Sequence, residues 1–269
     1  MSTVPLNVVV LAGDRGPDDP LCQAAGVPAK ALVPVGGRRV LDWVLDALDS
    51  LPAGGARIVS GPAAAALATA PDLVERLRAD HWQWLAPAES PATSALAAIR
   101  QAPAGAPLLL TTGDHALLTP AILAEFQRGA ERQRSAGAEL AVGFVPLERV
   151  MARFPGARRT ALRFRDVEVC TCNLFALLAP SAARVIDLWR QVERDRKQPW
   201  RIARLLGPLT LIRFLLRRVT LAEALDRLGK LAGTRIHAVL LDEPEAAVDV
   251  DSVADWELVK QVVAAREQA

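Results

Sequence analysis

Val8-Val9-Val10-Leu11-Ala12-Gly13-Asp14-Arg15-Gly16 is the stretch of sequence that decides the fold. Four consecutive apolar residues are typical of a short buried strand, as in the centre of a parallel sheet. The small residues behind them let backbone N–H groups approach phosphate oxygens closely. The stretch therefore predicts a strand followed by an anion-binding loop, although such a turn also occurs where nothing is bound.

Further along the chain, apolar runs that predict strands alternate with amphipathic runs that predict helices. Strands are expected at 57–60, 82–85, 107–112, 139–145, 160–164, 167–178, 235–241 and 246–250. Helices are expected at 40–51, 71–79, 90–100, 119–134, 181–194 (capped by Ser181) and from 251 onward, with 195–233 wholly helical and 12–37 irregular. This alternation predicts an α/β three-layer sandwich with a mostly parallel mixed sheet. We expect one domain over 1–269, with a helical insertion at 195–233.

Composition narrows the class of protein. The chain has 269 residues, 51% hydrophobic and 23% charged, which is enough for a sizeable core. A net charge of +2 gives no argument for a nucleic-acid partner. Three cysteines make no disulfide framework, and Cys170 and Cys172 are expected as buried thiols on one strand face. Without a signal peptide or an apolar run of about 18 residues, we expect a soluble, cytoplasmic protein.

Two basic residues and one acid stand where a nucleotide would lie. Arg15 and Lys30 carry the charge needed to neutralise a triphosphate. Asp114 follows the apolar strand 107–112, at the carboxyl end where α/β folds bind ligands. An aspartate there also serves as an ordinary helix N-cap, so both interpretations stay open for Asp114.

The motifs Val10-Leu11-Ala12-Gly13-x-Arg15 and 26–38, which reads Gly-Val-Pro-Ala-Lys-Ala-Leu-Val-Pro-Val-x-Gly-Arg, resemble the signature of the NTP-transferase superfamily. That superfamily includes molybdopterin guanylyl- and cytidylyltransferases, methylerythritol-phosphate cytidylyltransferase and sugar-1-phosphate nucleotidyltransferases. The resemblance covers 4–180 and resumes at 235–258. It implies a GT-A-type α/β fold, Mg²⁺, and a nucleotide bound over the first loop.

The resemblance also implies roles for particular residues. The nucleotide-binding residues would be Leu11, Ala12, Gly13, Asp14, Arg15, Lys30, Pro91, Ser94 and Gly113. Asp114 would bind Mg²⁺, with either Asp249 or Asp251 as the second ligand, and Arg15, Lys30 and Asp114 would carry catalysis. Asp251 is alternatively the cap of the last helix, and 90–95 is alternatively a cap with small packing residues.

The expected reaction is transfer of a nucleoside monophosphate from CTP, GTP or UTP to a phosphorylated acceptor, with release of pyrophosphate. Two departures from the family pattern, Asp14 in the loop and His115 after Asp114, put the donor base and the acceptor in question. One alternative is a GT-A glycosyltransferase, which wants an Asp-x-Asp at 114–116 where the chain has Asp-His-Ala. The other is a non-catalytic nucleotide-binding protein. The sequence does not indicate an oligomeric state.

The segment 195–218 interleaves arginines with leucines. Cationic and apolar residues this close suit a membrane surface or an amphiphilic phosphate, so a lipid precursor joins a phosphorylated small molecule as a candidate acceptor. This interpretation predicts peripheral contact with the inner face of the membrane. The alternative is an amphipathic hairpin packed on the sheet, with its arginines in solvent.

Overall fold

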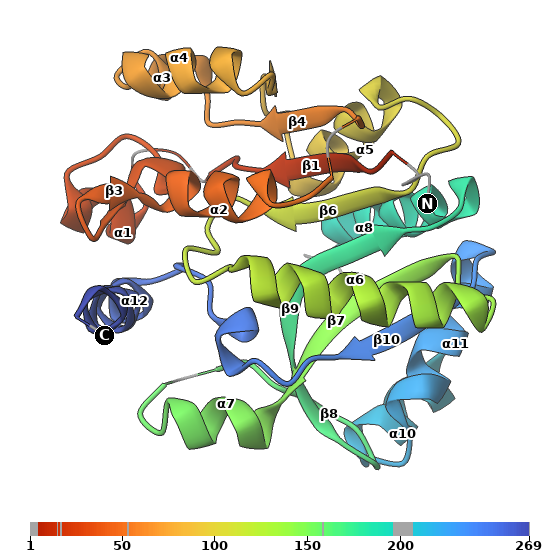
Figure 1. Cartoon of the computed structure of the whole chain (residues 1–269). Coiled ribbons are helices and arrows are strands. Elements are labelled where there is room, and N and C mark those ends of the chain that lie inside the picture. Colours follow the sequence, from red (N-terminus) through yellow and green to blue (C-terminus); the bar gives the residue numbers. More distant parts are fainter. Residues whose placement is uncertain are drawn as a thin grey trace.

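An eight-stranded mixed sheet runs through the middle of the molecule (Figure 1). The computed structural model describes residues 5–14, 16, 18–52, 54–157, 159–195 and 207–268. In their order across the sheet the strands are β10 (Ile236–Leu240), β7 (Leu140–Pro146), β9 (Glu168–Leu177), β6 (Leu108–Thr112), β1 (Asn7–Leu11), β4 (Arg57–Ser60) and β5 (Gln83–Leu85). The eighth, β8 (Leu162–Arg163), pairs with β9, and β2 (Pro34–Val35) pairs with β3 (Arg38–Arg39) in a separate ribbon.

Only β8 and β9 break the parallel arrangement of this sheet. Strand β9 runs antiparallel to both β6 and β7, and β8 is antiparallel to β9. The other six strands therefore point the same way, and their carboxyl ends meet at one edge of the sheet. Ligands of open α/β sheets bind at that edge.

Helices cover both faces of the sheet. Successive side chains of a strand point alternately to the two faces, so each strand packs against both helix layers. Val8 and Val10 pack into one core cluster, whereas Val9 and Leu11 pack into the other. The first cluster includes residues of α2 (Val40–Asp49), α4 (Pro71–Ala79), α6 (Pro120–Ser135) and α12 (Val253–Glu267). The second includes residues of α5 (Pro91–Gln101), α8 (Ala183–Asp195) and α11 (Leu221–Ala232). The predicted three-layer α/β fold is confirmed.

Shorter helices complete the described chain, namely α1 (Pro20–Ala25), α3 (Ala64–Leu67), α7 (Leu147–Arg153), α10 (Pro208–Leu215) and the 3-10 turns η1 (Lys30–Leu32), η2 (Pro180–Ala182) and η3 (Pro244–Ala247). The stretch 12–37, which was predicted to be irregular, contains the short helix α1. Asp19 caps this helix and Pro20 begins it, while Gly26 ends it in a left-handed conformation with a φ of 67°.

Three other local predictions were wrong. The stretch 246–250 is not a strand, because Pro244 begins η3 and the following residues join no sheet. Ser181 lies inside η2 and does not cap α8, which begins at Ala183. The segment 195–233 is not wholly helical, because a turn at 216–220 separates α10 from α11, and its residues 196–206 lie outside the described ranges.

Cys170 and Cys172 are buried, unpaired and in the same core cluster, as the strand spacing predicts. None of the helices in the described ranges is both long and apolar enough to cross a membrane.

Candidate active site

The loop after β1 leaves the sheet at the carboxyl end of the central strand. Leu11 and Ala12 are buried, whereas Gly13 is exposed. Asp14 turns back on its own loop, because its Oδ1 accepts a hydrogen bond from the backbone N–H of Gly16 at 2.8 Å. The carboxylate of Asp14, a residue that departs from the family pattern, thus stabilises the turn at 14–16.

Lys30 joins two acids from distant parts of the chain. Its Nζ lies 3.4 Å from Oδ2 of Asp114 and also forms an ion pair with Asp251. These two partners are 84 and 221 residues away along the chain. Burial lowers the pKa of Lys30, but the carboxylates of Asp114 and Asp251 outweigh burial and leave that pKa raised. The ammonium group therefore stays charged at neutral pH.

Asp114 follows β6 and is tied to the segment before the last helix. Its backbone carbonyl accepts a hydrogen bond from the N–H of Val250 at 2.9 Å, which brings the loop 248–251 beside the end of β6. Oδ1 of Asp114 is buried and has no hydrogen-bond partner among the described residues. A buried carboxylate oxygen without a partner is costly, so this atom is available to a cation or a donor.

Asp249 is held by two residues that the sequence did not single out. Its Oδ1 accepts from Arg159 at 3.3 Å, and its Oδ2 accepts from the side-chain amide of Asn173 at 3.1 Å. The Arg159 side chain is only 6% exposed and also pairs with Asp255 at 2.9 Å. Asn173 has a φ of 51° and lies at the register shift between β7 and β9.

The acids repel one another across this small region. Burial, together with the nearby carboxylates of Asp114 and Asp251, raises the pKa of Asp249 to about 6, although Arg159 acts to lower it. Asp251 itself is half exposed and does not cap α12, because the capping side chain is that of Ser252. Three carboxylates and Lys30 therefore share the carboxyl edge of the sheet beside the Gly13 loop.

The family model described as the MobA-like NTP transferase domain matches residues 8–235. The chain belongs to this family. The family consists of nucleotidyltransferase-type enzymes, as the resemblance implied.

Solved structures agree with the family. A hypothetical transferase from Thermus thermophilus is 30% identical, with a TM-score of 0.74 over 94% of this chain and 99% of that chain. The 4-diphosphocytidyl-2C-methyl-D-erythritol synthase from Anaerococcus prevotii is 8% identical, with a TM-score of 0.58 over 97% and 99%. The 2-C-methyl-D-erythritol 4-phosphate cytidylyltransferase, also from Thermus thermophilus, is 14% identical, with a TM-score of 0.52 over 95% and 98%. The last two show the fold alone. No curated protein sequence matches the chain.

The remaining predicted nucleotide-binding residues of this MobA-like chain differ in their burial. Ser94 is buried and its Oγ accepts the N–H of Ala88 at 2.8 Å, so it fixes the loop before α5, while Pro91 is exposed. Gly113 is buried, and a Cβ there would lie 2.9 Å from the Cβ of Ala12. Arg15 lies outside the described residues, so its contact with phosphate stays a prediction.

His115 is a core residue of this MobA-like chain. It is 1% exposed, its Nε2 is 3.2 Å from the backbone carbonyl of Glu245, and burial lowers its pKa. The second carboxylate of a glycosyltransferase Asp-x-Asp would stand at position 116, where this chain has the buried Ala116.

Sequence reasoning missed Arg159 and Asn173. Arg159 lies 90 residues and Asn173 76 residues from Asp249, so no local spacing connects them. The one available signal was Asn173 in a mostly apolar strand, because asparagine tolerates the left-handed conformation better than most residues with a side chain.

Proposed function

We propose that the protein is a Mg²⁺-dependent nucleotidyltransferase that transfers a nucleoside monophosphate from CTP, GTP or UTP to a phosphorylated acceptor and releases pyrophosphate. One observation carries the proposal. Lys30, Asp114 and Asp251, which are far apart in sequence, meet at the carboxyl edge of the sheet beside the exposed Gly13 loop. An ammonium group and two carboxylates there suit a triphosphate and its cation.

The residues present fit Mg²⁺. This ion prefers oxygen ligands and is usually held by one or two carboxylates together with substrate phosphates. In the described part of the chain, no three acidic, histidine or cysteine side chains are placed to hold a metal ion by themselves. Asp114, with its unpartnered buried Oδ1, and Asp251, with an exposed carboxylate, would therefore hold the ion jointly with the nucleotide.

Asp251 suits the second ligand position better than Asp249. Both oxygens of Asp249 already accept hydrogen bonds, from Arg159 and from Asn173. Asp251 shares Lys30 with Asp114, so those two carboxylates lie on either side of one cation. We therefore assign Asp249 to the support of this pair and Asp251 to the metal.

The chain's own groups act by positioning and by charge. An acceptor phosphate oxygen attacks the α-phosphorus and forms a new P–O bond, while the bond to the bridging oxygen breaks and its electron pair leaves with pyrophosphate. A phosphate monoester is already anionic near neutral pH, so no strong base is needed. Lys30 exchanges its carboxylate partners for phosphate oxygens, and the Gly13 loop contributes backbone N–H groups. When bound, Mg²⁺ supplies additional charge neutralisation at the phosphates.

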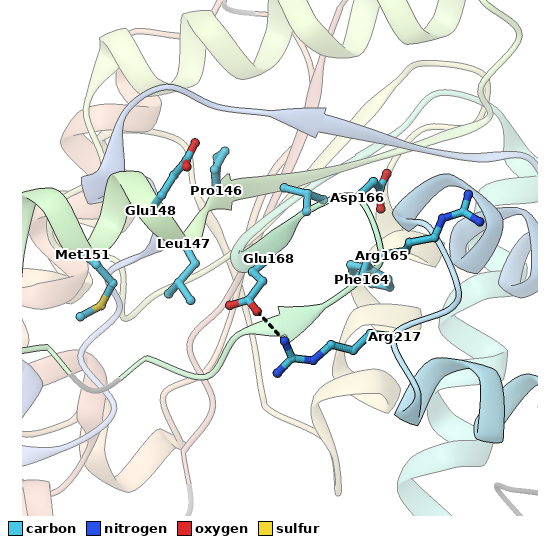
Figure 2. Close-up of a pocket in the computed structure, with 10 residues that line it drawn as sticks. Pro146, Leu147, Glu148, Met151, Phe164, Arg165, Asp166, Glu168 and Arg217 are labelled. Atoms are coloured by element: carbon cyan, nitrogen blue, oxygen red, sulfur yellow. Dashed lines mark hydrogen bonds and ion pairs between the residues drawn. The ribbon is translucent and has the colours of Figure 1, made fainter.

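The acceptor is proposed to enter beside the end of β7, at the same edge of the sheet. A pocket of about 640 Å³ there is lined by Glu148, Met151, Glu168 and Arg217, among others. Figure 2 shows Arg217 turned toward Glu168, with which it pairs at 3.3 Å. We propose a phosphorylated small molecule or lipid precursor as the acceptor. We also propose a cytoplasmic location, with peripheral contact at the inner membrane face through 195–218.

The test is an Asp114→Asn variant, which keeps the shape of the side chain and removes its charge. We expect the fold to survive while pyrophosphate release from NTP plus a panel of phosphorylated acceptors falls by at least about 100-fold. Asp226→Asn is the control, because Asp226 pairs with Lys230 on the exposed face of α11. Turnover by Asp114→Asn at the wild-type rate would refute the assignment, and NTP binding without turnover by wild type would favour a binding protein.

A further inference from the structure

Large apolar side chains are exposed together at the end of α10. Ile212, Leu215 and Leu216 are 52%, 70% and 58% exposed. Among the described residues, the only other exposed large hydrophobic side chains are those of Leu240 and Val253. The spacing i, i+3, i+4 places the first three on one side of the helix, and we call them the α10 face.

The opposite side of α10 anchors it to the protein. Phe214 packs edge-on against Phe164 of the β8–β9 hairpin, with ring centroids 5.6 Å apart. The connection to α11 is tied to the same hairpin, because Arg165 donates its N–H to the carbonyl of Val219 at 2.9 Å. The α10 face is therefore not what holds the helix in place.

Arginines flank the α10 face. Arg213, Arg217 and Arg218 are all exposed. Arg217 pairs with Glu168, whereas Arg213 and Arg218 form no ion pair with any residue in the described ranges. Exposed aliphatic side chains beside exposed guanidinium groups combine an apolar surface with positive charge.

We propose that the α10 face, with Arg213 and Arg218, is a docking surface for an anionic lipid bilayer. Among the side chains that the structure describes, the face comprises three, far short of the roughly 800 Å² that each partner of a stable protein complex buries. A bilayer does not need a large complementary surface, because apolar side chains enter the headgroup boundary while arginines attract anionic lipids. Charge complementarity thus favours a membrane over a second protein.

Docking at this face would bring the acceptor pocket close to the headgroups. Arg217 belongs to the pocket lining and directly follows the α10 face in sequence (Figure 2). This consequence rests on the proposed function, since it makes an anionic lipid precursor the favoured acceptor. The docking itself does not rest on the proposed catalysis, because lipid binding is measured without nucleotide or turnover.

The experiment is vesicle flotation of the full-length protein. Vesicles of phosphatidylcholine alone are compared with vesicles that also contain phosphatidylglycerol, at low salt and at about 0.5 M NaCl, where exposed charges are strongly screened. We expect wild type to float only with the anionic vesicles and only at low salt. Leu215→Gln/Leu216→Gln and Arg213→Ser/Arg218→Ser should each reduce the partition at least about tenfold.

Leu240→Gln is the matched control, because Leu240 is 50% exposed but lies on β10, outside the α10 face. Its flotation should equal that of wild type, and circular dichroism should show that all variants are folded. Wild type that stays with the soluble fraction overturns the inference, as does a leucine variant that floats like wild type. Self-association in sedimentation velocity that Leu215→Gln/Leu216→Gln abolishes would also overturn it, in favour of a second copy of the chain. Flotation without NTP binding would leave docking intact and refute only the proposed function.

Discussion

The ammonium group of Lys30 lies 3.4 Å from the carboxylate of Asp114, and η1 and the end of β6 present the two groups to each other. Asp251 completes the ion pair from the segment before α12. Without a ligand, Lys30 is the cation that compensates both carboxylates. The same charges explain the first prediction.

Lys30→Met should lower kcat/KM for pyrophosphate release by at least about 100-fold, because a charge that neutralises the phosphates is lost. It should also strengthen the mutual repulsion of Asp114 and Asp251 in the metal-free protein. Thermal melting in EDTA and in MgCl₂ measures that second effect, and Mg²⁺ should restore more stability to the variant than to wild type. Lys230→Met on α11 is the control and should behave as wild type.

Asn173 allows the orientation of Asp249 to be tested apart from backbone strain. Asn173→Gly keeps the left-handed conformation freely and removes only the amide, whereas Asn173→Ala adds strain of about 1–2 kcal/mol. Both variants should weaken Mn²⁺ binding in the presence of nucleotide, measured by electron paramagnetic resonance, to the same extent. Asn173→Ala should lose more unfolding free energy in urea than Asn173→Gly, because both lose the amide but only alanine adds left-handed strain. Unchanged Mn²⁺ affinity in both would show that the amide does not position Asp249.

Asp249 should make the stability of the metal-free protein depend on pH. Its pKa is about 6 in the folded protein and near 3.8 when unfolded, so the folded state binds the extra proton between these values. The contribution of this group to stability is therefore fully present below the lower pKa and is lost as the pH rises through about 6. We expect Asp249→Asn to lose this pH-dependent part of the unfolding free energy.

The measurement is the unfolding free energy in EDTA at pH values on either side of 6. The unfolding free energy of wild type, relative to that of Asp249→Asn, should be higher at the lower pH. A difference that is constant across the range would mean that Asp249 does not titrate there.

Gly113 should tolerate no side chain, because a Cβ would lie 2.9 Å from the Cβ and 3.3 Å from the Cα of Ala12. Gly113→Ala is expected to separate the end of β6 from β1 and to cost about 1–3 kcal/mol. Because Asp114 is the next residue, we expect the fraction of turnover that is lost to exceed the fraction of unfolding free energy that is lost. Gly156→Ala is the control, since a Cβ at Gly156 meets nothing within 4 Å. Equal melting temperatures for the two variants would contradict the packing argument.

The sequence predicted the parts of the site whose signals are local. The apolar run before Gly13 and the strand before Asp114 are continuous in sequence, so each strand end could be located without the structure. Lys30 came from the family motif, and the structure places it beside Asp114. The hydrogen bonds of Arg159 and Asn173 to Asp249 have no such signal, because they depend on how β9 packs beside the loop 248–251.

The error at 246–250 has a physical cause. Val248 and Val250 are buried on either side of Asp249, which gives the alternation of a strand. Alternation reports which side chains face the core, and it does not report whether the backbone finds a neighbouring strand. Here the Val250 N–H goes to the carbonyl of Asp114. The segment belongs to the site and not to the sheet.

That contact also orders events during synthesis. Asp251 follows Lys30 by 221 residues, so it leaves the ribosome long after Lys30 does. The nascent chain therefore carries Lys30 and Asp114 before it acquires the carboxylate of Asp251. A nucleotide that requires all three groups would bind only after Asp251 has joined them, and by mass action it would stabilise that form over partly folded chains.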